Sequence, residues 1–171
     1  NAVTFVDTTT KSYDPENDPR DAYAKDGSIY NEMEVRVICN DILPAILPTL
    51  SSEPNLKVGI ITPYKAQYFK LRSRLAGTDF ADAVHTIDSI QGSEFDIVLF
   101  SFVRSFPKTS GRTVGFLDDM RRLNVSLSRA KKKLILVGNL NTLQSREAHN
   151  DYGIPGMVSP VDVFESIATN V

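Results

Sequence analysis

The 171-residue chain contains one cysteine, two histidines and no tryptophan. The single cysteine, Cys39, excludes an internal disulfide and a zinc site built from several cysteines. No apolar run is long enough to cross a membrane, and residues 1–10 lack the basic flank and apolar stretch of a secretory signal. Because the chain does not begin with methionine, we expect a fragment of a longer protein, one that works inside the cell, in the cytoplasm or the nucleus.

Several chemical motifs are missing as well. No Gly-x-x-x-x-Gly-Lys-Ser/Thr run occurs, so the chain has no phosphate-binding loop of its own. Neither Gly-x-Gly-x-x-Gly after the first apolar run nor Gly-x-Ser-x-Gly is present, which disfavours dinucleotide-binding enzymes and serine hydrolases. The net charge of −2 argues against nucleic-acid binding by bulk charge, so any such contact must come from a local site. The residues suit one half of a site better than a self-contained hydrolase.

The patterns that are present predict one α/β domain. Short apolar runs alternate with helical stretches, which favours a mainly parallel central sheet with helices on both faces. The expected strands cover residues 2–6, 58–61, 84–87, 97–103 and 134–137. We expect residues 1–171 to form a single domain with a polar surface loop at 8–27, a basic, polar loop at 104–114, and a C-terminal extension at 144–171 that contains a helix at 161–168.

The first long helix has a clear predicted start and end. Asn31 is expected to cap it, with Glu34 reaching back as the partner in a capping box. Apolar residues then continue through Ile42. Because proline lacks a backbone N–H, we expect Pro44 and Pro48 to end or kink this helix.

Polar side chains gather where the predicted strands end, which is the edge at which parallel sheets bind ligands. Thr62 and Pro63 follow the run at 58–61, and we expect them to be the N-cap and first residue of a helix that reaches residue 76. Thr86 ends the next strand, and its hydroxyl could meet a phosphate.

The segment from residue 84 to 96 leaves one strand and enters the next through a turn at Gln91 and Gly92. A glycine there allows a ligand to approach the backbone or permits a positive φ, and Glu94 could accept hydrogen bonds from a ribose diol. The alternative is a plain surface turn in which Thr86 and Asp88 cap a short helix, and spacing alone favours that alternative.

A second polar string surrounds the helix expected at 120–128. Arg122 and Arg129 are seven residues apart and therefore share a helix face. Arg129 and the lysines at 131–133 could simply complement the helix dipole, which is sufficient for the lysines. Alternatively, Arg129 is an arginine finger that stabilises charge on a transferring γ-phosphoryl group.

Three strings together resemble motifs IV, V and VI of superfamily 1 helicases, most closely the branch that contains senataxin and the nonsense-mediated-decay helicase. They are Gly-Ile-Ile-Thr-Pro-Tyr at 59–64 with Gln67, Thr-Ile-Asp-Ser-Ile-Gln-Gly-Ser-Glu at 86–94, and Arg-Arg-Leu-Asn-Val-Ser-Leu-Ser-Arg-Ala at 121–130. The resemblance spans about residues 28–143 and includes the Ser28-to-Glu34 segment that opens the second RecA-like domain in that branch.

The resemblance implies a three-layer, RecA-like fold of the P-loop NTPase type, without a resident metal site. ATP and Mg²⁺ would bind jointly with an N-terminal RecA-like domain of the same protein. By this resemblance Arg129 is the finger that reaches the γ-phosphate, Glu94 meets the nucleotide sugar, and Gln91 and Gly92 line the same cleft. The isolated domain is then expected to be inactive as an ATPase.

The resemblance also implies a track for single-stranded DNA or RNA. The residues that would hold its sugar–phosphate backbone are Thr62, Pro63, Tyr64 and Thr86. ATP-driven closure of the two domains would then move the strand stepwise. Two alternatives stay open: a catalytically silent module that binds nucleic acid or a protein, and a flavodoxin-like small-molecule domain, for which the residues after the first strand offer only a weak phosphate loop.

Overall fold

The computed structural model describes residues 2–9, 20–106, 112–115 and 119–145. At its centre is a five-stranded sheet with strand order β1-β7-β6-β4-β5, in which every neighbouring pair is parallel. The strands are β1 (Ala2–Asp7), β4 (Val58–Thr62), β5 (Val84–Thr86), β6 (Phe95–Ser101) and β7 (Ala130–Gly138). The predicted α/β class with a parallel sheet is confirmed.

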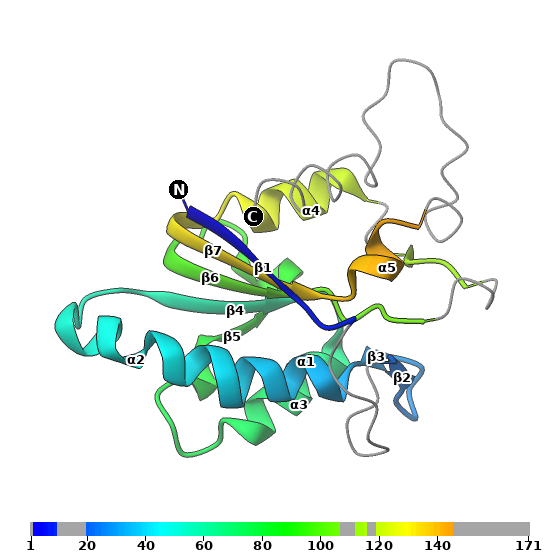
Figure 1. Ribbon diagram of the computed structural model, residues 1–171, viewed down its shortest axis with the longest axis horizontal. Helices are drawn as coiled ribbons and strands as arrows, with labels where there is room; N and C mark the ends of the chain where they lie inside the picture. The colour runs from blue at the N-terminus through cyan, green and yellow to red at the C-terminus, as the bar shows by residue number, and fades with distance from the viewer. Residues whose placement is uncertain (1, 10–19, 107–111, 116–118, 146–171) are drawn as a thin grey trace.

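Helices cover both faces of the sheet (Figure 1). One face packs against a long helical run, made of α1 (Glu32–Arg36), a π-helical turn η2 (Val37–Ile42) and α2 (Leu43–Ser52), and against α3 (Lys65–Arg74). The other face packs against α4 (Met120–Leu127), the short helix η4 (Ile87–Ile90) and α5 (Leu140–Leu143). A further short helix, η3 (Ala81–Ala83), precedes β5. Each face therefore has its own apolar core.

The central strands leave no room for larger side chains at one glycine. A Cβ atom on Gly59 would lie 2.7 Å from the ring of Phe95 on the neighbouring strand. Real Cβ atoms do not come that close, so the absence of a side chain at this position lets the ring fill the sheet surface.

The prolines of the first long helix do not end it, contrary to the prediction. Pro44 and Pro48 neither end the helix nor interrupt it, because the helical run continues to Ser52 with Pro48 inside α2. The turn before Pro44 widens into η2, which accommodates a residue that lacks an N–H. Asn31 caps the helix as predicted, accepting a hydrogen bond from the Glu34 N–H at 3.1 Å.

The predicted surface loop at residues 8–27 is also corrected in its described part. Thr8 is fully buried and Asp21 is 7% exposed. The strands β2 (Ala22–Tyr23) and β3 (Ile29–Tyr30) form a short antiparallel hairpin. Residues 10–19 lie outside the described residues. The prediction rested on local polarity and missed that Asp21 pairs with two arginines distant in the sequence, Arg104 and Arg112.

The predicted loop after β6 is confirmed at its described ends, because residues 104–106 and 112–114 belong to no helix or strand, but their burial was not predicted. Arg104, Ser105, Phe106 and Val114 are all buried, and the last two belong to the core under α4. The helix expected at 161–168 and most of the extension at 144–171 lie outside the described residues.

Candidate nucleotide and nucleic-acid interface

Two residues that are predicted to bind single-stranded nucleic acid lie side by side at the carboxyl ends of β4 and β5. Thr62 and Thr86 are register partners across these parallel strands. Thr86 is half-buried and caps η4 in a capping box, in which the Ser89 hydroxyl accepts from the Thr86 N–H at 3.1 Å. Thr62 is fully buried, and its hydroxyl finds no hydrogen-bond partner among the described residues. Only Thr86 of this pair therefore offers its side chain to the surface.

The start of α3 differs from the prediction. Tyr64, in extended conformation, is the N-cap residue, and the helix begins at Lys65. Thr62 is therefore not the cap and Pro63 is not the first helical residue, because Thr62 still belongs to β4 and pairs with β5. Pro63 and Tyr64 are half-buried, and the Tyr64 hydroxyl donates to the carbonyl of Val114 at 3.3 Å.

The turn between η4 and β6 is exposed as expected. Gly92 has a φ of +83°, a backbone conformation that side-chain-bearing residues rarely adopt. Space around Gly92 is open, since nothing lies within 4 Å of a Cβ built there. Gln91 and Glu94 are also exposed, so the turn presents its polar groups to the outside of the domain.

Arg129 follows α4 and lies against this turn. Its backbone carbonyl accepts from the N–H of Phe95 at 3.0 Å, which fixes the end of α4 to the residue after the turn. Its half-buried side chain donates from Nε to the carbonyl of Val125 at 2.8 Å. The pKa of Glu94 is lowered, first by a hydrogen bond from Lys131 and further by the charges of Lys131 and Arg129. Arg129 and Glu94 therefore lie close enough for their charges to interact.

The lysines after Arg129 have a different role from the one predicted. They lie in β7 and not at the end of a helix. Lys131 pairs with Glu94 at 2.8 Å, Lys132 pairs with Glu53 at 3.0 Å, and the ammonium of Lys133 donates to the Thr4 hydroxyl at 2.5 Å. Sequence reasoning missed Lys131 as the partner of Glu94 because the contact joins the beginnings of β6 and β7, which are far apart in the chain.

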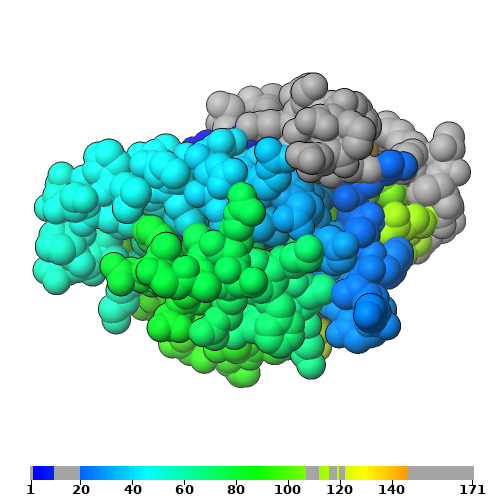
Figure 2. All heavy atoms as spheres, turned by 90° about the horizontal axis from the view of Figure 1, so that it is seen from below, coloured from blue at the N-terminus to red at the C-terminus, as the bar shows by residue number. Residues whose placement is uncertain are grey.

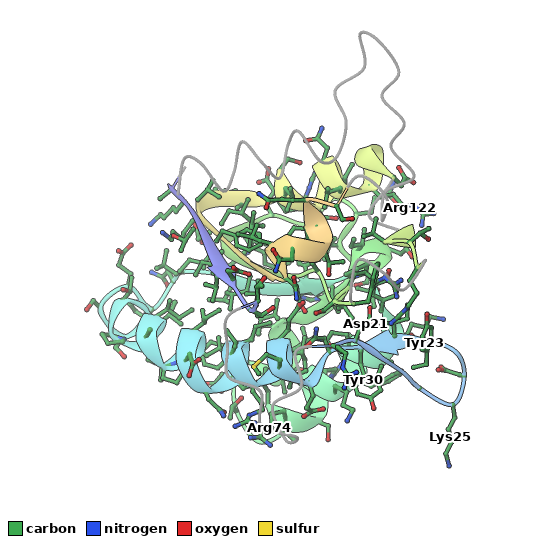
Figure 3. The ribbon with its side chains drawn as sticks, turned by 45° about the vertical axis from the view of Figure 1, so that its right-hand side comes forward. Asp21, Tyr23, Lys25, Tyr30, Arg74 and Arg122 are labelled. Carbon is green, nitrogen blue, oxygen red and sulfur yellow. The ribbon has the colours of Figure 1, made fainter. Side chains whose placement is uncertain are left out.

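A pocket of about 380 Å³ lies between η4 and α4. Its lining combines Gln91 from the turn with Arg122 from α4. Val125, which is 42% exposed, contributes an apolar wall. Figure 3 labels Arg122 at this edge of the domain, and its guanidinium lies 3.5 Å from Asp119. Segments from motifs V and VI thus line a single hollow.

A buried network of polar side chains lies at the carboxyl end of β6. Glu34 is fully buried and accepts from the Ser101 hydroxyl at 2.6 Å and from the Val103 N–H at 2.9 Å. Gln67 donates to the Ser101 hydroxyl at 3.0 Å and accepts from the Asn31 N–H at 2.8 Å. Burial raises the pKa of Glu34 to about 8, although the two hydrogen bonds it accepts act in the opposite direction.

The network also holds a strained residue. Val103 has a φ of +72°, although it is β-branched. Its N–H is bound by Glu34 and its carbonyl accepts from Asn31 Nδ2 at 3.1 Å. The sequence signal for these contacts was present, because Asn31, Glu34 and Gln67 belong to the helicase-like strings. Their partners at the end of β6 were not predicted.

Arg104, directly after Val103, forms a structural ion pair. Its Nη1 lies 3.2 Å from Asp21, and both side chains are almost fully buried. Arg112 binds the other oxygen of the same carboxylate and also the Tyr23 hydroxyl. The two guanidinium groups lie over the ring of Phe106, at 4.8 Å and 4.9 Å from its centre. This cluster ties the β2–β3 hairpin to the end of β6.

Comparison with known proteins identifies the family of this chain. A family described as an AAA domain matches residues 1–141. The chain is 37% identical to the helicase sen1 of Schizosaccharomyces pombe over 127 residues, which cover 69% of this chain and 7% of that protein. The chain belongs to the superfamily 1 helicases of the senataxin branch. The predicted family is therefore confirmed.

Two further relatives of this helicase domain carry similar names. An ATP-dependent helicase of Methanocaldococcus jannaschii is 41% identical over 96 residues, which cover 56% of this chain and 14% of that protein. The human DNA replication ATP-dependent helicase/nuclease DNA2 is 38% identical over 126 residues, covering 73% of this chain and 11% of that protein. The chain thus spans only a small part of each of these three relatives. Among the described residues, no helix has the length and apolar character to span a bilayer.

Proposed function

We propose that this domain is the C-terminal motor domain of an ATP-dependent nucleic-acid helicase or translocase. The observation that carries the proposal is the position of Arg129, half-buried at the end of α4, where its carbonyl accepts at 3.0 Å from the N–H of Phe95, the residue after Glu94. A guanidinium and a carboxylate at one exposed edge suit the γ-phosphate and the ribose of a nucleotide. Gln91 and Gly92 lie on the same edge.

The other wall of the ATP site is assigned to an N-terminal RecA-like domain of the same protein. This chain has no phosphate-binding loop, and its described residues contain no cluster of three or more His, Cys, Asp or Glu side chains that could hold a metal. Mg²⁺ would therefore be held by the other domain together with the phosphates of ATP. Closure of the two domains on ATP and their release on hydrolysis would change the grip on a strand held by Pro63, Tyr64 and Thr86.

The proposed nucleic-acid track differs from the sequence prediction at one residue, Thr62. Because Thr62 is fully buried, it supports the track from beneath, and direct contact is assigned to the half-buried Pro63, Tyr64 and Thr86. Thr86 and the N–H groups beginning η4 would face a phosphate of single-stranded DNA or RNA.

The test is the ATPase activity of the full-length protein with Arg129→Ala and Arg129→Lys. We expect kcat to fall roughly 10³-fold for the alanine variant, because an arginine finger acts chiefly on the transition state. The lysine variant should remain impaired, since an ammonium lacks the planar fork of a guanidinium. Single-strand affinity, measured by fluorescence anisotropy, should change little in both variants.

Lys132→Ala is the matched control, because Lys132 is a nearby exposed cation that pairs with Glu53 at 3.0 Å. Its kcat should equal that of the unaltered protein. A normal kcat in Arg129→Ala would refute the finger assignment. A parent protein that binds strands without any ATP turnover would favour the silent binding module instead.

A further inference from the structure

A second hollow, of about 560 Å³, lies between the β2–β3 hairpin and α3, apart from the pocket between η4 and α4. Its lining includes two aromatic rings, those of Tyr30 and Phe69, and three charged residues, Lys25, Asp26 and Lys70. Figure 2 shows the face on which the hairpin and α3 meet. In Figure 3, Lys25 lies at the tip of the hairpin and Tyr30 at its base.

The hollow exposes aromatic surface to solvent. Phe69 is 65% exposed, the largest exposed fraction given for a large apolar side chain in the described part of the chain. Tyr30 is half-buried, and the ammonium of Lys70 lies 4.5 Å from the centre of its ring. A planar ligand that covers Phe69 would remove this apolar surface from water, with a cation already close by.

The helix that presents Phe69 is positively charged within an acidic chain. Its sequence from Lys65 to Arg74 contains four basic residues and no acidic one, whereas the whole chain has a net charge of −2. Lys70 is 44% exposed and pairs with Glu32 at 3.0 Å, in a geometry that solvent screens. A charge of this sign on one helix favours an anionic ligand.

The hollow and the proposed nucleic-acid track are built on the same helix, α3. Tyr64 is the N-cap of α3, and Phe69 lies five residues later, which is about 7 Å along the helix axis. The N–H of Ala66 donates to the Ser28 hydroxyl at 3.0 Å, which fixes the first turn of α3 to the end of the hairpin. A strand leaving the track at Tyr64 would reach this hollow within one or two nucleotides.

We propose that this hollow is a base-stacking pocket for single-stranded nucleic acid. One base stacks on Phe69 beside Tyr30, and Lys25 and Lys70 bind an adjacent phosphate. The assignment rests on the proposed function and extends its track from the strand ends along α3. Because stacking uses the face of a base, the pocket accepts any base and both DNA and RNA.

The lining favours a nucleobase over an apolar protein segment. Protein docking sites present contiguous apolar patches. Here, the other large apolar side chains with high exposure in the described residues are Val3, Tyr23, Leu47 and Val125, and none of them lines this hollow. One exposed ring among charged groups matches the combination of a π-face and cations that holds single strands.

The test measures binding of labelled oligothymidylate and oligouridylate to the full-length protein by fluorescence anisotropy at several salt concentrations. Phe69→Ala should weaken both affinities about fivefold to a hundredfold without changing their salt dependence, because a stacked base is lost. Lys70→Gln should weaken binding and reduce the salt slope by about one, because one phosphate contact is lost.

Each variant has a matched control. Leu47→Ala removes an apolar side chain that is 45% exposed on α2, and Lys132→Gln removes a cation with a 3.0 Å ion pair and an exposed fraction of 55%. Both controls should bind strands like the unaltered protein. In Phe69→Ala, strand-stimulated ATPase should reach the normal kcat but require more strand for half-maximal activation.

The outcomes separate this inference from the proposed function. If Phe69→Ala binds both oligonucleotides normally while the unaltered protein shows strand-stimulated ATPase, the stacking pocket is refuted and the motor assignment stands. An equal loss in Leu47→Ala would refute the pocket as well, because the effect would not be specific to it. If the unaltered protein binds neither oligonucleotide, both assignments fail.

Discussion

Replacing the buried Glu34 tests whether the network beneath the strand ends holds the domain together. In Glu34→Ala, the Ser101 hydroxyl and the Val103 N–H both lose an acceptor inside the core. Leaving a buried donor unsatisfied costs about 1–3 kcal/mol, so the two together cost about 2–6 kcal/mol. Relaxation of Val103 from its positive φ returns about 1 kcal/mol of this. We therefore expect the free energy of unfolding to fall by about 1–5 kcal/mol.

The raised pKa of Glu34 predicts that the stability of the domain depends on pH. The pKa of Glu34 is about 8 in the folded chain, against 4.5 for an unperturbed glutamate. Between these values, the folded chain keeps a proton that the unfolded chain releases. The contribution of protonated Glu34 to the free energy of unfolding is therefore fully present below pH 4.5 and falls as the pH rises to about 8. Its slope is at most about 1.4 kcal/mol per pH unit.

Urea unfolding followed by circular dichroism, at about pH 5 and about pH 8, measures both effects. Glu34→Gln is the informative partner, because it keeps the size and one acceptor of the side chain but does not titrate in this range. The unaltered chain should lose stability relative to Glu34→Gln as the pH rises. A Glu34→Ala chain as stable as the unaltered one, or parallel pH profiles for the unaltered chain and Glu34→Gln, would refute the reasoning.

Two other substitutions test the packing around the site. Gly59→Ala should lower the free energy of unfolding by about 1–3 kcal/mol, measured by urea unfolding, because its Cβ would meet the Phe95 ring at 2.7 Å. A neutral effect would mean that the ring moves aside freely. Asp21→Asn should cost about 3–5 kcal/mol in the same assay, because Arg104, only 5% exposed, loses its counter-charge. Asp82→Asn, at an exposed pair, is its control, and equal losses in the two variants would contradict the buried-pair argument.

The existence of the strands was predictable from the sequence because apolar runs are local signals, although β6 ends at Ser101 and not at residue 103, and β7 begins at Ala130 and not at residue 134. The run from Ile97 to Phe100 forms the middle of β6, and Asn31 caps its helix where a capping residue was expected. The turn at Gly92 has the positive φ that a glycine there permits. Signals confined to a few neighbouring residues therefore located the strands and the turn. They did not show that Glu94 and Arg129 precede β6 and β7, and so lie at the opposite edge of the parallel sheet from Thr62 and Thr86.

Contacts between distant segments could not be predicted in the same way. Glu34 was expected to reach back to its own helix cap, and instead binds the end of β6. Asp21 was placed in a solvated loop because its neighbours are polar, yet its partners are arginines more than eighty residues later. Pro44 was expected to end or kink the helix, because the wider π-helical turn before it leaves no mark in the local pattern.

The order of the strands sets a condition on how the chain is made. Among the residues that the structure describes, β1 pairs only with β7, so that Ala2 meets Lys133 and Asp7 meets Gly138. On a ribosome, the first strand must therefore wait until almost all the described residues have been synthesised before it finds its neighbour. Until then β6 presents an unpaired edge to other nascent chains. Shielding of that edge by chaperones would matter more for the yield of this protein than for its final stability.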